Sequence, residues 1–303
     1  MKKLAGLLLL LSLVSFASAQ DASDKNLISS RATTTTTEKT TLDIFDLDAT
    51  YVWESDITNG RNYGKQDALE FGAGYSHRFL LRGNWYLRGG LEYHRFDFSS
   101  TFAPLPDHLQ SVAAVVSLEY MVGNDVGAFL RFDPGFYFEN DINRSSFDVP
   151  ITLGRAFVLQ PDKLFLFVGA NVAFLRGQYP VLPLAGIVWR PNKQWTVDFV
   201  PPQPRVIYSP NDRWDFWVGG QLTGWSYRTD RDNTIVPARL NGAQVDYSEY
   251  RGAVGFTWHP TQQTSFDVGG GYVFQRRFNF ERAGEEYKAD PAPFVRAAFK
   301  AEF

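Results

Sequence analysis

The chain has 303 residues, a formal net charge of −3 and no cysteine. The lack of cysteine excludes disulfides, thiolate catalysis, cysteine-ligated metals and a lipoprotein anchor. Because lysine and arginine alternate with acidic residues along the whole chain, no basic face for a nucleic-acid partner is predicted. Hydrophobic residues make up 44% and aromatic residues 16%, which argues against a disordered body and is typical of strands with aromatic belts.

Residues 1–19 have the three parts of a secretory signal peptide. Two lysines precede an apolar run at residues 4–16, and Ala17-Ser18-Ala19 offers a cleavage site before Gln20. The apolar run is shorter than the roughly 20 residues that a membrane-spanning helix needs, so we expect cleavage after Ala19. Residues 20–41 are polar and rich in threonine, and they are predicted to form a flexible periplasmic tail. The alternative, a binding segment or pore plug, lacks apolar anchors.

From residue 42 onward, apolar and polar side chains alternate with period two, the pattern of a β-strand with two different faces. In the first such segment Phe45 and Tyr51 share one face, whereas Asp46 and Asp48 share the other. Fourteen strands are predicted in this way, at residues 42–55, 66–81, 85–98, 109–122, 126–139, 146–159, 163–175, 181–190, 194–200, 204–209, 213–229, 245–258, 264–280 and 293–303. The ninth and tenth are short and joined by a proline-rich turn, so twelve full strands is the alternative.

The connections between these segments alternate in length. Short turns rich in Gly, Asn, Asp and Pro are expected at residues 82–84, 123–125, 160–162, 191–193, 211–212 and 260–262. Longer connections include residues 56–65, 99–108, 230–244 and 281–292. This alternation is typical of short periplasmic turns opposite long extracellular loops, and it predicts periplasmic N- and C-termini.

The polar face of these strands carries so many ionisable groups that packing it into a dry core would be costly. Turning that face to water and the aromatic face to lipid removes the conflict, and a closed barrel leaves no unpaired strand edge in hydrocarbon. The sequence therefore predicts an all-β protein, in which residues 42–303 form an antiparallel transmembrane β-barrel.

The last strand, residues 294–303, ends in an aromatic residue and places Phe299 and Phe303 on one apolar side, opposite Lys300 and Glu302. In this it resembles the C-terminal assembly signal of bacterial outer-membrane β-barrels, the porin-like superfamily, although Ala301 stands where a larger hydrophobe is usual. The resemblance implies the outer membrane of a Gram-negative bacterium, with its lipids and lipopolysaccharide as surroundings, and insertion by the barrel-assembly machinery. It points to a family outside the named porins, transporters and enzymes.

The inner face of this barrel is the predicted functional surface. The predicted lumen-lining residues are Asp46, Asp48, Glu70, Arg88, Glu92, His94, Arg131, Asp133, Trp217, Glu249, Arg251, Asp267 and Arg277. Because the signs alternate on adjacent strands, salt-bridge ladders are favoured over a site for calcium or an anionic solute. Four inward aromatic residues, Tyr137, Trp217, Trp225 and Tyr247, are expected to pack against one another rather than to stack on sugars.

No catalytic residue, metal ligand or cofactor is predicted. His94 shares its face with Glu92 and Arg88, where a hydrogen-bonded wall network is favoured over a proton relay. A barrel lipase uses a serine activated by a histidine on the outer wall, and no serine is expected level with a histidine on a neighbouring strand. Residues 269–271 are three glycines that continue as strand, so they are expected to relieve curvature or to make room for an aromatic ring.

Fourteen strands generally leave more lumen than an eight-stranded barrel can fill with side chains. We therefore expect a passive porin-like channel or small-solute transporter rather than an enzyme. The alternatives are a non-conducting structural or adhesion barrel and, less favoured, a lipid-modifying enzyme of the outer membrane.

Overall fold

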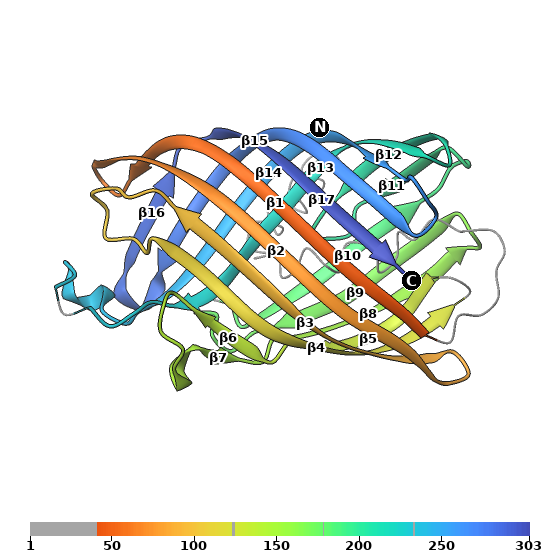
Figure 1. Ribbon diagram of the computed structural model, residues 1–303, viewed down its shortest axis with the longest axis horizontal. Helices are drawn as coiled ribbons and strands as arrows, with labels where there is room; N and C mark the ends of the chain where they lie inside the picture. The colour runs from red at the N-terminus through yellow and green to blue at the C-terminus, as the bar shows by residue number, and fades with distance from the viewer. Residues whose placement is uncertain (1–40, 123–124, 178, 233) are drawn as a thin grey trace, which may run out of the picture.

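The computed structural model describes residues 41–122, 125–177, 179–232 and 234–303. The signal peptide and the tail predicted within residues 1–40 lie outside the described residues. The described chain forms one antiparallel sheet that closes on itself into a fourteen-stranded barrel (Figure 1). Its helical segments are three short 3₁₀ turns, and no described helix is long and apolar enough to cross a membrane.

The strands follow the predicted segments, but β1 and β2 extend into the predicted long connection 56–65, and β16 lies within the predicted long connection 281–292, so these two predicted connections are wrong. They are β1 (Thr41–Thr58), β2 (Asn62–Arg82), β3 (Trp85–Phe98), β4 (His108–Val122), β5 (Asp125–Phe132), β6 (Gly135–Phe138), β7 (Phe147–Asp148), β8 (Ile151–Gln160), β9 (Leu164–Val172), β10 (Val181–Trp189), β11 (Trp195–Asp198), β12 (Arg205–Asn211), β13 (Trp214–Arg228), β14 (Gln244–Trp258), β15 (Thr264–Phe280), β16 (Glu285–Ala289) and β17 (Ala292–Glu302). The 3₁₀ turns are η1 (Arg144–Ser146), η2 (Ala238–Leu240) and η3 (Glu281–Ala283).

Three strands of the wall are split by proline. Pro134 separates β5 from β6, Pro150 separates β7 from β8, and Pro291 separates β16 from β17. Proline lacks the N–H that a ladder needs, so each pair of short strands counts as one strand of the barrel. The seventeen segments therefore make fourteen wall strands.

The barrel closes where β17 pairs with β1, from Ile44 opposite Glu302 to Val52 opposite Phe294. The short strands β11 and β12 pair with each other, and they also pair with β10 and β13 respectively. Fourteen strands are thus confirmed, and the twelve-strand alternative is wrong because the proline-rich hairpin is part of the wall. The wall is low there, since β11 has four residues.

The outer face of the wall is apolar and exposed. On β2, Leu69 is 45% and Tyr75 51% exposed, whereas Glu70 between them is 2% exposed. A water-soluble surface does not carry so continuous an apolar band. The band is bounded on β2 by Asp67 and His77, ten residues apart. At about 3.3 Å per residue and a tilt of about 40°, this distance spans about 25 Å, the height of the apolar band of outer-membrane barrels.

Tyrosines mark the two borders of this band. The Tyr51 hydroxyl donates to Asp67 over 3.0 Å at one border, and the Tyr75 hydroxyl donates to Asp43 over 2.7 Å at the other. A phenol that places its ring against lipid and its hydroxyl on a polar partner is typical of the membrane interface. The short turns, the start of β1 and the end of β17 lie at one end of the barrel, and the long connections lie at the other (Figure 1).

At the end with the long connections, which we call the loop end, the wall narrows. Strands β8 to β12 lie toward the end with the short turns (Figure 1). At the loop end, β6 therefore meets β13 directly, through a parallel bridge between Phe138 and Arg228. The Glu139 amide donates to the Arg228 carbonyl over 3.1 Å, and the Asp230 amide donates to the Glu139 carboxylate over 2.8 Å. These contacts join two strands that are far apart in the sequence.

Buried aromatic side chains fill the interior near this junction. Tyr247 lies 4.8 Å from Phe96, 5.2 Å from Phe98 and 4.9 Å from Phe278, measured between ring centroids. Trp225 joins them at 5.5 Å from Phe96. We call this group the loop-end aromatic cluster. Tyr137, Trp225 and Tyr247 all belong to the buried core at this end, whereas Trp217 lies outside it. Their ring partners are mainly other aromatic residues, such as Phe96 and Tyr227, rather than one another.

We expect Val268→Arg to lower the free energy of unfolding by about 2–4 kcal/mol, the cost of an arginine on the lipid face near the bilayer midplane. Val268 is 41% exposed on the outer face of β15. Val236→Arg is the matched control because Val236 is 78% exposed in a connection at the loop end. Urea unfolding in lipid vesicles measures both, and equal midpoints for Val268→Arg and the parent would contradict the outward orientation.

We expect Glu139→Gln to stabilise the loop end at pH 7. Burial raises the pKa of Glu139 above its usual value of 4.5, against the lowering effect of the hydrogen bond from Asp230. When folding raises the pKa of a carboxyl group, the protein loses stability as the pH rises from the pKa of the unfolded state to that of the folded state. The gain from Gln should therefore disappear below pH 4.5. Amide exchange at Asp230 measures it, and a gain that persists at pH 4 would contradict this origin.

Candidate functional site: the inner face of the barrel

Twelve of the thirteen predicted lumen-lining residues face inward. Glu70, Glu249 and Arg251 are buried completely or nearly so, and a Cβ added at Gly72 would meet both Asp48 and His94. The twelve are Asp46, Asp48, Glu70, Arg88, Glu92, His94, Arg131, Asp133, Trp217, Glu249, Arg251 and Asp267. All of them except Asp46 and Asp48 belong to, or lie beside, the ion clusters described below.

Arg277 is the exception, and its inward assignment is wrong. A β-bulge lies where Tyr250 pairs with Gln275 and Arg251 with Val273, so the extra residue reverses the alternation of β15 beyond that point. Arg277 is thereby turned outward, where its Nε lies 2.8 Å from Glu286. Arg276 takes the inward position, is 1% exposed and donates to the Gln66 carbonyl over 2.7 Å.

Arg251 is the centre of the ion cluster beneath the loop-end aromatic cluster. Its Nη1 lies 2.7 Å from Glu70 and its Nη2 lies 2.6 Å from Glu249. The Tyr247 hydroxyl also donates to Glu249, which ties the ion cluster to the aromatic one. A buried guanidinium with two carboxylates has paid a large desolvation cost, so the loss of one partner leaves an uncompensated charge.

A second ion cluster has Arg131 at its centre. Arg131 is 2% exposed, and its guanidinium contacts Glu92 at 2.7 Å and Asp133 at 2.6 Å. His94 lies beside it with its ring 5.1 Å from that of Trp225. Here the structure contains a cavity of about 10 Å³, enough for one water molecule. It is lined by Glu92, His94, Ser111, Ala113, Asp133, Tyr137 and Trp225.

Ser111 is the direct cross-strand partner of His94, so the expectation that no serine lies level with a histidine is wrong. The register of β3 on β4 depends on the connection at residues 99–107, whose geometry the alternation does not reveal. Both side chains are buried inside the barrel, at 4% and 5% exposure. A bilayer lipid on the outer wall cannot reach them, so this pair gives no support to a lipid-modifying enzyme.

Two further clusters have an acid at the centre. Glu119 is completely buried, 2.8 Å from Arg88 and 3.6 Å from Arg78. Asp267 lies 3.2 Å from Arg205 and 3.4 Å from Arg296. The sequence patterns did not single out Arg205, because the short β12 beside the prolines offers too few residues to read a register.

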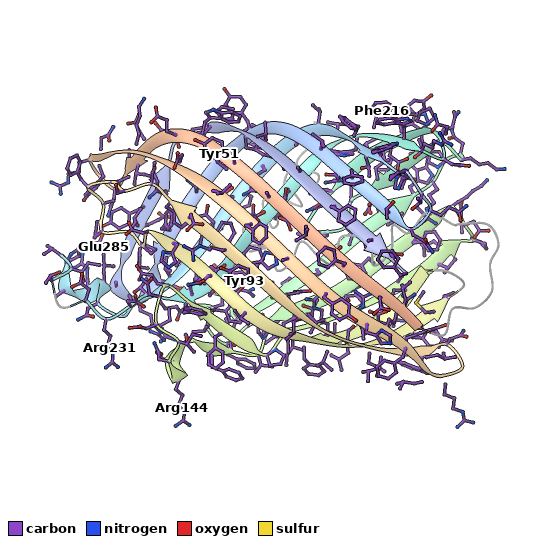
Figure 2. All side chains as sticks on the ribbon, in the orientation of Figure 1. Tyr51, Tyr93, Arg144, Phe216, Arg231 and Glu285 are labelled. Atoms are coloured by element: carbon purple, nitrogen blue, oxygen red, sulfur yellow. The ribbon has the colours of Figure 1, made fainter. Side chains whose placement is uncertain are left out.

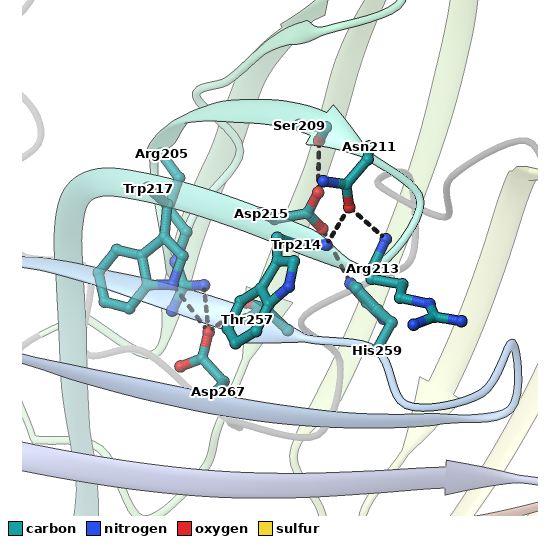
Figure 3. Close-up of polar contacts among 10 residues, drawn as sticks. All are labelled: Arg205, Ser209, Asn211, Arg213, Trp214, Asp215, Trp217, Thr257, His259 and Asp267. Atoms are coloured by element: carbon teal, nitrogen blue, oxygen red, sulfur yellow. Dashed lines mark hydrogen bonds and ion pairs between the residues drawn. The ribbon is translucent and has the colours of Figure 1, made fainter.

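Trp217 completes the Asp267 cluster (Figure 3). Its ring packs against two glycines, since a Cβ would come within 2.4 Å of it at Gly255 and 2.6 Å at Gly269. The Arg205 guanidinium lies 3.9 Å from the ring centroid, and the indole Nε1 donates to Asp267 over 2.9 Å. The first glycine of the run, Gly269, therefore makes room for an aromatic ring, as one of the two interpretations predicted, whereas Gly271 closely approaches the backbone of β14.

A serine, an aspartate and a histidine also meet near the short turns (Figure 3). The Ser209 hydroxyl donates to Asp215 over 2.5 Å, and Nε2 of His259 lies 2.9 Å from the other oxygen of Asp215. The carboxylate lies between the other two groups, so the histidine is not placed to accept the serine proton as a catalytic triad requires. Among the described residues, no group of three His, Asp or Glu side chains is arranged to hold a metal.

A closed ladder with an aromatic exterior and an ion-paired interior defines a transmembrane β-barrel of the outer-membrane type. Comparison with protein-family models and with curated protein sequences finds no match. Similar solved structures include a TodX monoaromatic hydrocarbon channel mutant, at 13% identity and a TM-score of 0.49 over 95% of this chain and 96% of that chain.

An outer-membrane channel from Pseudomonas putida F1 is 12% identical, with a TM-score of 0.43 over 87% of this chain and 95% of that chain. The Escherichia coli outer-membrane protease OmpT is 9% identical, with a TM-score of 0.28 over 90% of this chain and 100% of that chain. Similarity of this degree assigns neither a solute nor a mechanism to the present chain.

We expect Arg251→Met to lower the free energy of unfolding by about 3–5 kcal/mol, because Glu70 and Glu249 would keep their charges without a partner. Adding Glu70→Gln and Glu249→Gln should restore most of that loss, since the buried charges are then gone. Urea unfolding of the single and triple variants measures the difference. A triple variant no more stable than the single one would show that packing, not charge, is responsible.

Proposed function

We propose that the chain is a passive channel for small solutes, which is closed at the loop end in this conformation. The observation that carries the proposal is the ion-paired inner face. Arg251, Arg131, Glu119 and Asp267 are each flanked by two opposite charges. Buried ion pairs contribute less stability than apolar packing of the same volume, so a barrel with only a structural role has no need of them. An open form of the barrel, in which water reaches these groups, does.

The four clusters predict weak ion selectivity. The two clusters centred on arginine carry one excess negative charge each, and the two centred on an acid carry one excess positive charge each. These contributions cancel, whereas a strong preference needs a ring of one sign at a constriction. A small polar solute with either sign of charge, or none, fits such a lumen better than a highly charged one.

The second candidate is a non-conducting structural barrel. It is favoured by the loop-end aromatic cluster, in which Phe96, Tyr247 and Phe278 are completely buried. These residues belong to strands β3, β14 and β15, so a loop movement alone does not remove them from the interior of the barrel.

Single-channel recording of the refolded protein distinguishes the two candidates. The channel proposal predicts discrete openings with weak selectivity, and it predicts that Arg88→Gln shifts the reversal potential toward cations under a salt gradient, because Glu119 then keeps only Arg78. Arg95→Gln is the matched control, since Arg95 pairs with Asp97 on the outer face. Folded barrels that never conduct would reject the channel and favour the structural barrel.

The C-terminal strand is proposed as the segment that the barrel-assembly machinery recognises. Phe299 packs its ring 4.9 Å from Phe266 and 6.4 Å from Phe45, and Phe303 is 57% exposed at the end of the chain. The exposed aromatic side chain at the end of the strand that closes the barrel supports a role before closure, when β17 has not yet met β1. The same proposal places the start of β1 and the end of β17 on the periplasmic side of the membrane.

We expect Phe303→Asp to reduce the amount of heat-modifiable protein inserted in the outer membrane several-fold. The in vitro refolding of the purified variant should change much less, because Phe303 makes few contacts in the finished barrel. Val295→Asp is the control for the loss of lipid contact alone. Val295 lies on the same face of β17, seven residues before the end of the strand. Insertion of Phe303→Asp at the parental level would reject the assembly role.

A further inference from the structure

The water-sized cavity beside the Arg131 ion cluster is built by segments that are far apart in the sequence. Side chains from β3, β4, β6 and β13 converge on it, together with Asp133 between β5 and β6. In Figure 2 the side chains of these strands crowd both faces of the wall, so a polar cavity between them is not a gap in the packing of one strand pair. It is a candidate site for a small ligand.

Ser111 turns an unused hydroxyl toward this cavity. The residue is 4% exposed, and within the described part of the chain its hydroxyl makes no hydrogen bond. A buried hydroxyl without a partner is unfavourable, because folding has removed it from water. A ligand in the cavity would restore the hydrogen bond that Ser111 loses on folding.

The polar lining offers acceptors rather than donors. While they are charged, the carboxylates of Glu92 and Asp133 can only accept hydrogen bonds. The Tyr137 hydroxyl donates its proton to the Asp133 carbonyl over 3.1 Å, so its oxygen is left as an acceptor. A water molecule both donates and accepts, whereas an ammonium group has only N–H donors and needs acceptors alone.

The charge at the cavity favours a cation. Among the described residues, two carboxylates line it and no lysine or arginine does. Arg131 contacts both carboxylates, at 2.7 and 2.6 Å, and compensates one negative charge. Asp48 is a third acid nearby, because a Cβ added at Gly72 would lie 2.5 Å from its Oδ1 and 3.0 Å from Nδ1 of His94. The indole of Trp225 adds an aromatic wall of the kind that attracts ammonium groups.

We propose that this cavity binds an ammonium nitrogen, either as the free ion or as the head group of a small primary amine. Such a nitrogen is close to water in size, carries one positive charge and donates hydrogen bonds without accepting any. Ser111, Glu92 and Asp133 are the acceptors that we assign to it. The solute class that this site implies rests on the proposed channel function, whereas the binding itself does not.

The test uses the refolded mature barrel in detergent and follows the indole N–H signal of Trp225 by NMR, assigned with Trp225→Phe. Sodium chloride is replaced stepwise by ammonium chloride or methylammonium chloride at constant chloride. We expect a saturable shift of this signal and no shift for Trp217, which is similarly buried but lies outside the cavity. Saturation by both salts assigns the amine head group, saturation by ammonium alone assigns the free ion, and either result supports the site.

Ser111→Ala should weaken ammonium binding at least tenfold, because it removes a hydrogen bond to a charged group. Ser117→Ala is the matched control, since Ser117 is 3% exposed on the same inward face of β4 but does not line the cavity. Parental affinity in Ser111→Ala, or equal weakening in both variants, would overturn the site.

A shift that does not saturate, or one that potassium chloride produces equally well, would also overturn the ammonium site. Heat-modifiability shows that each variant is folded. Because binding is measured without conduction, a barrel that binds ammonium but never conducts rejects the channel and keeps the site. A barrel that conducts but does not bind ammonium rejects the site and keeps the channel.

Discussion

The closed backbone ladder is the constraint on which the rest of this structure depends. In hydrocarbon every backbone N–H and C=O needs a partner within the protein, and the nine pairs between β1 and β17 remove the last free edge. Proline is tolerated where the ladder can continue around it. The carbonyl of Pro134 accepts from Ala114 and the carbonyl of Pro150 accepts from Asp133, so the strands break without leaving a gap in the hydrogen bonding.

A wall one layer thick gives every strand two different surroundings, and the two faces of this barrel follow from that. Outside, apolar side chains meet lipid. Inside, the charges are compensated in groups of three, with Arg251 and Arg131 between pairs of acids, and Glu119 and Asp267 between pairs of arginines. A central charge with two opposite charges beside it is better compensated than a charge with one partner. This explains how the large charged side chains of Arg131 and Arg251 can be buried.

The strands, their number and most of the inner face could be predicted from the sequence because period-two alternation is a local property. Predictions failed where a feature is not local. One extra residue at the bulge opposite Tyr250 exchanged Arg276 for Arg277, and the register across residues 99–107 placed Ser111 beside His94. The contact between β6 and β13, ninety residues apart, leaves no periodic signal at all.

The junction of β6 with β13 is also where the wall has the fewest backbone pairs. Phe138 and Arg228 form a single bridge, whereas β13 and β14 pair along fifteen residues, from Trp214 to Arg228. Tyr137 on β6 and Tyr227 on β13 are each next in sequence to a residue of this bridge, and their rings lie 6.4 Å apart. Separation of the bridge would move these two tyrosines apart without breaking any long ladder. If the barrel conducts, this junction is therefore the part of the wall that can open at the lowest cost in hydrogen bonds.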